Sequence, residues 1–541
     1  MSPRARLALL VSILLGACSV FTGEVPLDQS AELIAQGGEE PLRDDPRPIR
    51  GQARVLLVAL DGVGRTNLRA AIAADRLPAV RRWLGDPVDE TLSTHGYDPE
   101  GVLSILPSTT MAAWSSVFTG EPPARTGVPG NEWFERESEQ LRAPAPVSVT
   151  GMDHTLRMYT ESWLGARIET ATLYEQLDVR SHVSMMPVHR GADLLTTASG
   201  SDIAQVLSVL AEGVFGRRGL EREAFSELDE DSVDEALDGI EAHGVPDLQV
   251  VYFPGVDLVT HSSDPPIDAQ QRHLEEIIGP GLERILREYE RRGLAEQTYL
   301  LVIADHGHTP VTEAGAISTD GDADPPAILE AVGFRMRPFT LETSEVAYSA
   351  VVAYQGGLAY VYLADRSTCP TENDDCDWAP PPRRDEDVLV AARAFAQGPL
   401  ADRLSMVVVP DRERDALWVV DEDGALEPLR AHLRRHPRPT WLDPVRRLRE
   451  LALGPYGDRA GDVILISRLD AALPAEERTY FSAPSHSWHG GPTQMDSEVP
   501  LLVATPGASG RDLRARVERH LRPRRSQLRV APLVLDLLGR D

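Results

Sequence analysis

The chain alternates short apolar runs with longer stretches of helical periodicity. Residues 55–60 are a continuous apolar run of strand length, and residues 248–253 and 299–304 are similar runs. Strands that are apolar on both faces are typical of a parallel sheet covered by helices. Between the runs lie helical patterns such as residues 267–292, which we expect to be interrupted at Gly279-Pro280. The pattern predicts an α/β fold, with a mainly parallel sheet and helices on both faces.

The domain organisation follows from where this pattern changes. Residues 312–460 are rich in Pro and Asp and carry several short β patterns, so we expect an inserted α+β cap there. A core strand pattern returns at residues 462–467, and residues 530–539 predict a closing amphipathic helix. We therefore expect one catalytic domain over residues 51–541, with the cap inside it.

The N-terminus has the features of an export signal. Arg4 and Arg6 precede an apolar run over residues 7–15 that is too short to span a bilayer. The run ends in Leu15-Gly16-Ala17-Cys18, which resembles the lipobox of bacterial lipoproteins. This resemblance implies a signal peptide over residues 1–17 and lipidation of Cys18. An ordinary signal peptide with a chance Cys is the alternative.

Lipidation would place the protein in the cell envelope. We expect a flexible tether over residues 18–50, because this stretch is polar, contains Pro and Gly and has little periodicity. The protein would be exported and lipid-anchored at the outer membrane or the periplasmic face, and Cys18 would be its only contact with the membrane.

The remaining cysteines, Cys369 and Cys376, lie in a polar loop. In an exported protein such a pair is typical of a small structural disulfide. Two free thiols remain the alternative, and a zinc site is less favoured because no His lies near them.

The overall charge narrows the classes of partner. The chain has 84 Asp plus Glu against 54 Lys plus Arg, a formal charge of −30, and every fixed cation is an Arg. An acidic surface repels phosphate backbones, which argues against general nucleic-acid binding. The sequence indicates no oligomeric state.

Five short motifs carry the candidate chemistry. In chain order they are Asp61-Gly62-Val63-Gly64, Leu106-Pro107-Ser108-Thr109-Thr110, the segment from Asp257 to His261, Asp305-His306-Gly307 and His489-Gly490-Gly491. Asp and His without Cys suit zinc or another borderline divalent ion. Each motif alone is weak, because a strand-end Asp is usually a turn former or a helix cap. Their combination after buried strands favours a metal site.

Taken in this order, the motifs resemble the alkaline phosphatase superfamily, in its branch of type I phosphodiesterases and nucleotide pyrophosphatases. Phosphonoacetate hydrolase is a relative of this branch. The resemblance implies an alkaline-phosphatase-like α/β hydrolase that acts on small phosphorylated substrates with two zinc ions, or with another divalent metal in one site.

The resemblance also implies roles for single residues. Thr110 would be the nucleophile and would form a phospho-Thr intermediate. Asn131, which lies 21 residues after Thr110, would bind a phosphoryl oxygen. One ion would be held by Thr110, Asp61, Asp305 and His306, and the other by Asp257, His261 and His489.

Several positions depart from the family pattern or leave alternatives open. Ala113-Trp114 replaces the family's Asn-His, which puts nucleotide recognition in doubt. His486 is an alternative ligand to His489, and Thr109 an alternative nucleophile to Thr110. His308 is either an orienting neighbour of a ligand or a surface residue. Arg125 is either a substrate contact or a surface residue.

Other functions within this superfamily fit less well. Sulfatases need a Cys or Ser nucleophile, and the related mutases work in the cytosol. Phosphoethanolamine transferases carry membrane spans that are absent from the sequence. A phosphonate hydrolase, or a non-catalytic surface-binding lipoprotein on this fold, remains the alternative to a phosphate ester hydrolase. Because the surface is acidic, we expect anion binding to depend on the metal.

Overall fold

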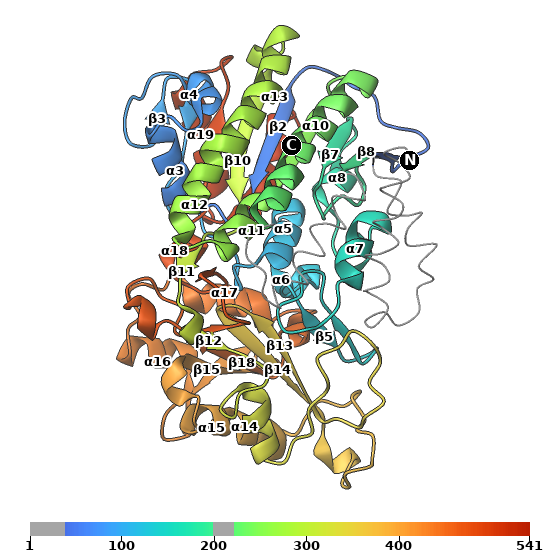
Figure 1. Ribbon diagram of the computed structural model, residues 1–541, viewed down its shortest axis with the longest axis vertical. Helices are drawn as coiled ribbons and strands as arrows, with labels where there is room; N and C mark the ends of the chain where they lie inside the picture. The colour runs from blue at the N-terminus through green and yellow to red at the C-terminus, as the bar shows by residue number, and fades with distance from the viewer. Residues whose placement is uncertain (1–37, 199–220, 541) are drawn as a thin grey trace, which may run out of the picture.

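A nine-stranded sheet forms the centre of the larger part of the molecule (Figure 1). The computed structural model describes residues 38–198 and 221–540. The strands of this sheet, in spatial order, are β1 (Gly38–Pro41), β8 (Leu194–Thr197), β7 (Ser181–Ser184), β9 (Leu248–Phe253), β2 (Arg54–Leu60), β10 (Thr298–Ala304), β21 (Leu501–Ala504), β4 (Gly96–Tyr97) and β3 (Leu92–Ser93).

Five consecutive strands of this sheet, from β8 to β10, are parallel. β2 lies between β9 and β10, and it pairs in parallel register with both. These three strands are the apolar runs that the sequence pattern predicts, and β2 and β9 are buried along their whole length. Because they are parallel neighbours, their carboxyl ends meet at one edge of the sheet.

Helices cover both faces of the sheet, as the alternating side chains of β2 require. Val55, Leu57 and Ala59 pack in the core under α5 (Thr110–Thr119), α19 (Gly510–Leu521) and α20 (Val530–Leu537). Leu56, Val58 and Leu60 pack in a second core under α3 (Arg65–Ala73), α4 (Pro78–Leu84) and α13 (Gly279–Arg291). The predicted α/β fold is confirmed.

The expected interruption at Gly279-Pro280 is not a break in direction. α12 (Pro266–His273) continues through a π-helical turn (Leu274–Ile278) into α13. Pro280 lies just after the π-helical turn, at the start of α13.

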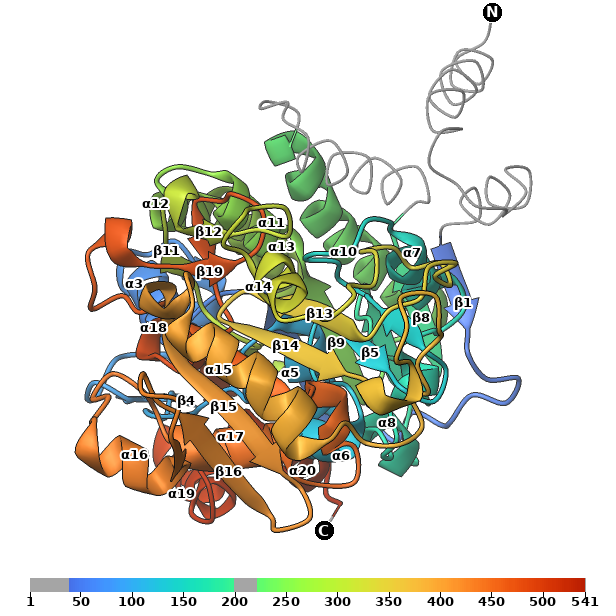
Figure 2. The ribbon, with the colours of Figure 1, turned by 90° about the horizontal axis from the view of Figure 1, so that it is seen from below.

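A second, antiparallel sheet lies at the other end of the molecule, in the lower part of Figure 1. Its strands, in spatial order, are β13 (Ala350–Gln355), β14 (Leu358–Leu363), β18 (Val463–Ser467), β15 (Leu404–Asp411), β16 (Ala416–Val420) and β17 (Leu426–Pro428). α14 (Pro325–Ala331) and α15 (Leu389–Gln397) cover one face, and Figure 2 shows α15 lying across the strands. α17 (Pro444–Ala452) packs on the other face.

Two expected boundaries need correction. β18 belongs to the second sheet, which therefore extends beyond residue 460. The end of the expected tether is held on the domain, because β1 pairs with β8 and the Gly51 N–H donates to Asp247 Oδ1 at 2.7 Å. The sequence of β18 shows a buried run but does not show which sheet the run belongs to. The sequence of β1 has no apolar pattern, because β1 is an exposed edge strand.

Cys369 and Cys376 form a disulfide. The proposed signal peptide, Cys18 and residues 18–37 lie outside the described residues. Within residues 38–198 and 221–540, no helix is both long and apolar enough to cross a membrane.

Candidate active site

Polar residues gather where the central parallel strands end. Asp61 follows β2, and Asp305-His306 follows β10. Asp257 and His261 lie one helical turn apart on α11 (Gly255–Ser262), which follows β9. The helix therefore turns both side chains toward the same place.

His489 reaches this place through a small strand pair. β11 (Thr309–Pro310) pairs with β20 (Ser487–Trp488), so the segment before His489 runs beside the segment after His306. The two imidazole rings stack with their centroids 3.5 Å apart. Residues separated by most of the domain in sequence are thus brought into one cluster.

The cluster contains three overlapping groups of possible metal ligands. In each group one ligand atom per residue lies within 4.8 Å of the others. The groups are Asp61, Asp305 and His306; Asp257, His261 and His489; and Asp257, His306 and His308. The first two match the Asp and His residues of the two ligand sets that the resemblance implies. His486 belongs to none of the groups found among the described residues.

Backbone carbonyls orient the three predicted histidine ligands. Nδ1 of His261 lies 2.7 Å from the Ser487 carbonyl oxygen. Nδ1 of His489 lies 2.9 Å from the Ser108 carbonyl oxygen, and Nδ1 of His306 lies 3.1 Å from the Gly307 carbonyl oxygen. A neutral imidazole that donates from Nδ1 keeps the lone pair of Nε2 free. Each ring therefore offers Nε2 to the cluster.

Gly62 leaves room for the side chains of His308 and Asp257 beside its backbone. Its φ is +69°, and a Cβ at this position would lie 2.5 Å from His308 Nε2 and 2.7 Å from Asp257 Oδ1. A side chain would therefore collide with the cluster, in a backbone conformation that already favours glycine.

Thr110 is the first residue of α5, and its hydroxyl faces the cluster. Thr110 Oγ1 lies 3.3 Å from His306 Nε2. A helix N-terminus stabilises negative charge, both on an ionised hydroxyl and on a bound anion. Thr109 is the residue before the helix, and its hydroxyl is buried with no hydrogen-bond partner among the described residues.

Asn131 lies beside the start of the same helix. Its Oδ1 accepts a hydrogen bond from the Met111 N–H at 3.0 Å, and its backbone N–H donates to Gln355 Oε1 at 2.7 Å. The first bond occupies the acceptor end of the amide. The amide nitrogen of Asn131 thus remains available as a donor.

The buried charges of the cluster suit a cation. Asp61 Oδ1 and Asp305 Oδ2 are buried and make no hydrogen bond within the described part of the chain. Burial raises the pKa of Asp61 well above its usual range and that of Asp305 to about 8. Burial also lowers the pKa of His306 to about 3. Carboxylate oxygens that accept no hydrogen bond, next to neutral imidazoles, are what a divalent ion would bind.

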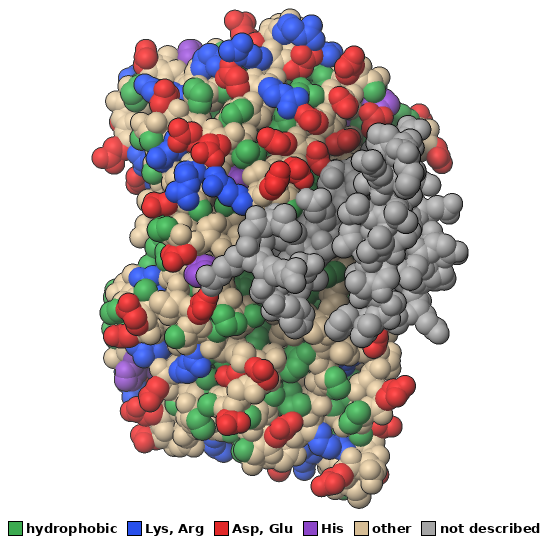
Figure 3. All heavy atoms as spheres, viewed as in Figure 1, with side chains coloured by type: hydrophobic (Ala, Val, Ile, Leu, Met, Phe, Trp, Pro, Cys, Tyr) green, Lys and Arg blue, Asp and Glu red, His purple; other side chains and the backbone are tan. Residues whose placement is uncertain are grey.

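Figure 3 shows acidic side chains spread over the described part of one face, with basic ones among them. Arg125, a possible substrate contact, is 58% exposed and pairs with Glu121 at 2.8 Å.

Sequence reasoning missed two residues that support the cluster, and it left the place of a third open. The Tyr252 hydroxyl donates to Asp61 Oδ2, and the side chain of Gln355 holds the backbone of Asn131. His308 Nε2 lies 2.7 Å from Asp257 Oδ1, and its Nδ1 lies 3.0 Å from Ser487 Oγ. The only sequence signal for Tyr252 is a polar group near the end of an otherwise apolar strand.

Trp114, at the position that departs from the family pattern, belongs to the core. It is fully buried, and its ring packs edge-on against Tyr252 with 5.6 Å between centroids. This residue therefore supports Tyr252 from behind and does not line the site.

The comparisons with known proteins agree with this geometry. The family model for type I phosphodiesterase / nucleotide pyrophosphatase matches residues 55–491. The chain belongs to this family. It is a phosphoric ester hydrolase. No curated protein matches it in sequence.

Solved structures of ectonucleotide pyrophosphatase / phosphodiesterase 5 share the fold of the chain. Mouse ectonucleotide pyrophosphatase / phosphodiesterase 5 superimposes with a TM-score of 0.51 at 12% identity, covering 90% of this chain and 95% of the mouse one. An inactive variant of the mouse protein in complex with AMP gives a TM-score of 0.52 at 12% identity, with 90% and 96% covered. Phosphonoacetate hydrolase from Sinorhizobium meliloti 1021, in complex with phosphonoacetate, gives 0.48 at 17% identity, with 92% and 99% covered.

Proposed function

We propose that this hydrolase cleaves phosphate esters (phosphodiesters, pyrophosphates or phosphomonoesters) with Thr110 as nucleophile and two zinc ions. The observation that carries the proposal is the Thr110 hydroxyl at the start of α5, 3.3 Å from His306 Nε2 in the ligand cluster. A Thr hydroxyl is a poor nucleophile unless its pKa is lowered. The N-terminus of α5 and the metal ions of the ligand cluster would both lower it.

The residues of the cluster divide into two ligand sets. Asp61, Asp305 and His306 with Thr110 would hold one ion, and Asp257, His261 and His489 the other. The donors are carboxylate oxygens and imidazole nitrogens without sulfur, which suits zinc and also admits another divalent ion in one site. When bound, such ions lower the pKa of a nearby hydroxyl or water and neutralise charge on the phosphoryl group.

The residues of the chain would then act in two steps. Thr110 Oγ1 attacks phosphorus, the bond to the leaving oxygen breaks, and the leaving group takes up a proton. A water molecule next attacks the phospho-Thr110 intermediate, the bond from phosphorus to Oγ1 breaks, and Thr110 regains its proton. The Asn131 amide donates to a phosphoryl oxygen as negative charge develops on it.

Substitution of Thr110 tests this mechanism. We expect Thr110→Ala to reduce turnover by about 10³-fold or more, because the nucleophile is lost. Thr110→Ser should keep part of the activity and should accumulate a phosphorylated peptide after acid quenching, detected by mass spectrometry. Thr109→Ala is the matched control and should retain activity. Hydrolysis by Thr110→Ala at the wild-type rate would contradict the proposal.

A substrate panel and metal analysis test the finer assignment. The panel contains p-nitrophenyl phosphate, bis-p-nitrophenyl phosphate, a p-nitrophenyl nucleotide ester and phosphonoacetate. The ratio of diester to monoester turnover decides the ester class, and preferred cleavage of phosphonoacetate would replace the ester assignment. Fewer than one bound zinc per chain in the active protein would contradict the use of two zinc ions.

We also propose that Cys18 is lipidated after removal of residues 1–17. The support is the sequence Leu15-Gly16-Ala17-Cys18 after a short apolar run. Metabolic labelling with radioactive palmitate should label the wild-type protein in membrane fractions but not Cys18→Ser. Equal labelling of the variant would contradict lipidation at this residue.

A further inference from the structure

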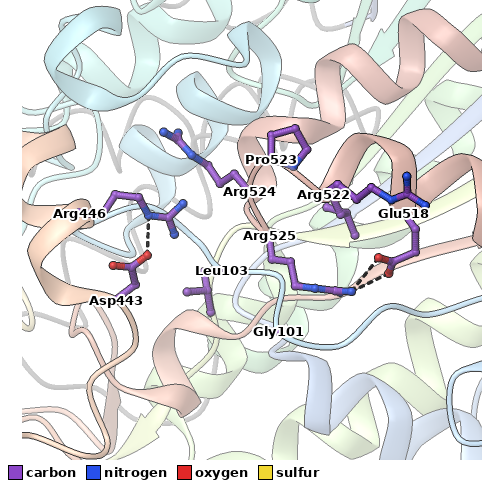
Figure 4. Close-up of a pocket in the computed structure, with 10 residues that line it drawn as sticks. Gly101, Leu103, Asp443, Arg446, Glu518, Arg522, Pro523, Arg524 and Arg525 are labelled. Atoms are coloured by element: carbon purple, nitrogen blue, oxygen red, sulfur yellow. Dashed lines mark hydrogen bonds and ion pairs between the residues drawn. The ribbon is translucent and has the colours of Figure 1, made fainter.

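Two adjoining cavities lined by arginines lie beside α19. The larger has a volume of about 540 Å³ and the smaller about 430 Å³, and they share Glu518, Arg522 and Arg525. Figure 4 shows Arg446 and Arg525 on opposite sides of the larger cavity, with Leu103 between them. None of the lining residues belongs to the metal-ligand cluster.

The lining is positively charged although the chain is acidic. Six arginines line the two cavities: Arg446, Arg511, Arg514, Arg522, Arg524 and Arg525. The only acidic residues in the lining are Asp443 and Glu518, and Glu450 pairs with Arg524 from outside it. The cations exceed these acids by three, in a chain whose formal charge is −30. Such a local excess concentrates anions.

Some of these arginines are held in place. Arg525 Nη2 contacts both carboxylate oxygens of Glu518 at 2.8 Å, and Arg446 Nε contacts Asp443 at 2.6 Å. The Tyr97 hydroxyl also donates to Glu518 at 2.5 Å. The carboxylate of Glu518 is thus paired with Arg525 and Tyr97, and these contacts fix the side chains that line the cavities before a ligand binds.

Two other arginines have side chains with no partner. Arg511 and Arg522 are exposed, and their guanidinium groups make no hydrogen bond, ion pair or ring contact within the described residues. Arg514 differs from these two, because its guanidinium lies 5.8 Å from the centre of the Tyr97 ring. The donors of the Arg511 and Arg522 guanidiniums are therefore unused within the described residues.

We propose that these cavities bind a ligand through its phosphate groups, at a site separate from the metal cluster. Planar guanidiniums match the oxygens of phosphate in pairs, which a point charge does not do. Arg522 and Arg525 belong to both cavities, so the two together admit neighbouring phosphoryl groups of one molecule. Binding there does not depend on metal, because no lining residue is a metal-ligand candidate.

Calorimetric titration with inorganic phosphate tests this site. The full-length protein is titrated both as purified and after removal of metal by a chelator. We expect phosphate binding to survive metal removal, because no residue that lines the cavities is a metal-ligand candidate. The acidic cluster cannot attract the anion without its ions, so the binding that remains belongs to the cavities. The double variant Arg511→Gln/Arg522→Gln should bind about tenfold or more weakly after chelation. Turnover of p-nitrophenyl phosphate should not change in this variant.

Arg519→Gln is the matched control. Arg519 is an exposed arginine on the same helix that lines neither cavity. Its removal should leave phosphate binding unchanged. Loss of all binding on chelation, or equal weakening in Arg519→Gln, would overturn the proposal. Failure of the Thr110 experiment would leave it standing, since the two sites share no residue.

A second arm distinguishes the source of the phosphate. Vesicles of phosphatidylcholine with and without phosphatidic acid are sedimented with the wild-type protein and the double variant. Binding that requires phosphatidic acid, Arg511 and Arg522 identifies a lipid headgroup. Binding of free phosphate without vesicle binding identifies a soluble ligand. Absence of both overturns the site.

Discussion

At the scale of single residues, the contact between Tyr252 and Asp61 links the core to the proposed metal site. The Tyr252 hydroxyl donates to Asp61 Oδ2, and the ring packs against Trp114. The hydrogen bond fixes one carboxylate oxygen, and Asp61 Oδ1 then faces the cluster without a partner. Orienting contacts of this kind set the affinity for a metal.

Tyr252→Phe tests this role. We expect the variant to bind zinc about tenfold more weakly, because Asp61 loses the bond that orients it. The free energy of unfolding should fall by about 1 kcal/mol, the usual contribution of one hydrogen bond. Zinc affinity is measured by competition with a chromophoric chelator, and stability by urea titration.

Tyr362→Phe is the control for Tyr252→Phe. Tyr362 lies in β14 of the second sheet, and its hydroxyl donates to the Arg459 carbonyl at 2.6 Å. Neither residue belongs to the groups of possible metal ligands. It should lose a similar amount of stability and keep its zinc affinity. Equal zinc affinities in the two variants would show that Tyr252 serves the core alone.

The same contact shows where sequence reasoning ends at this scale. Asp61 and Asp305 could be selected because each directly follows a buried apolar run, and Asp257 and His489 because their motifs lie near such runs. The resemblance supplied the roles of these residues. Tyr252 bonds to a residue 191 positions away, and Gln355 to one 224 positions away. Pairings at such distances depend on how the sheets pack, which local pattern does not encode.

At the scale of elements, the hairpin of β13 and β14 connects the second sheet to the site. Its turn is Gly356-Gly357, where the Gly357 N–H donates to the His489 carbonyl at 2.8 Å. Gly356 has a φ of +64°, and a Cβ there would lie 2.3 Å from the same carbonyl. Only glycine permits so close an approach, so the second sheet helps to position both His489 and Asn131.

Gln355→Leu tests this connection. Leucine keeps the volume but cannot accept the bond from the Asn131 N–H. We expect turnover to fall by about 10-fold to 100-fold, because Asn131 loses its fixed place beside Thr110. Bound zinc, measured by atomic absorption, should stay constant, because Gln355 is not among the ligand candidates.

Gln397→Leu serves as the comparison for this substitution. Gln397 lies at the end of α15, on the outer side of the same sheet, and donates to the Glu422 carbonyl at 3.3 Å. It should retain wild-type turnover. A loss of zinc in Gln355→Leu, in parallel with activity, would mean that the hairpin supports the ligands and not Asn131.

The elements were predictable to different degrees. β2, β9 and β10 follow from their apolar runs, and α5 from its position after Thr109 with Gly120 as a left-handed cap. β18 has the same pattern as these strands but lies in the other sheet. A run that is buried on both faces indicates a strand and its burial, and the choice of sheet depends on long-range pairing.

At the scale of the whole molecule, net charge and buried carboxylates oppose the binding of an anion at the ligand cluster unless metal cations are present. Asp61, Asp257 and Asp305 lie together in a chain of formal charge −30. In the metal-free protein, burial raises the pKa of Asp61 and brings that of Asp305 to about 8. Metal ligation needs the ionised forms, so binding the ions must release protons near neutral pH.

The stability of the protein should therefore depend on pH and on metal together. A carboxyl group with a raised pKa in the folded state contributes stability that is complete below the unfolded value of about 4. In the metal-free protein this contribution is lost as the pH rises through about 8. Bound zinc removes the loss by pairing with the carboxylates, so stabilisation by zinc should increase from about pH 5 to about pH 8.

Thermal unfolding of chelated and dialysed protein, with and without added zinc, measures this difference. We expect the zinc-induced rise in Tm to be small at about pH 5 and several degrees at about pH 8. Each kcal/mol moves Tm by about 1 °C in a chain of this size, and zinc at about 1,000 times its Kd contributes about 4 kcal/mol per site. Asp305→Asn removes one titrating carboxyl and should flatten the pH dependence of the metal-free protein. A rise in Tm that is equal at both pH values, or larger at the lower one, would contradict the buried-carboxylate account of metal binding.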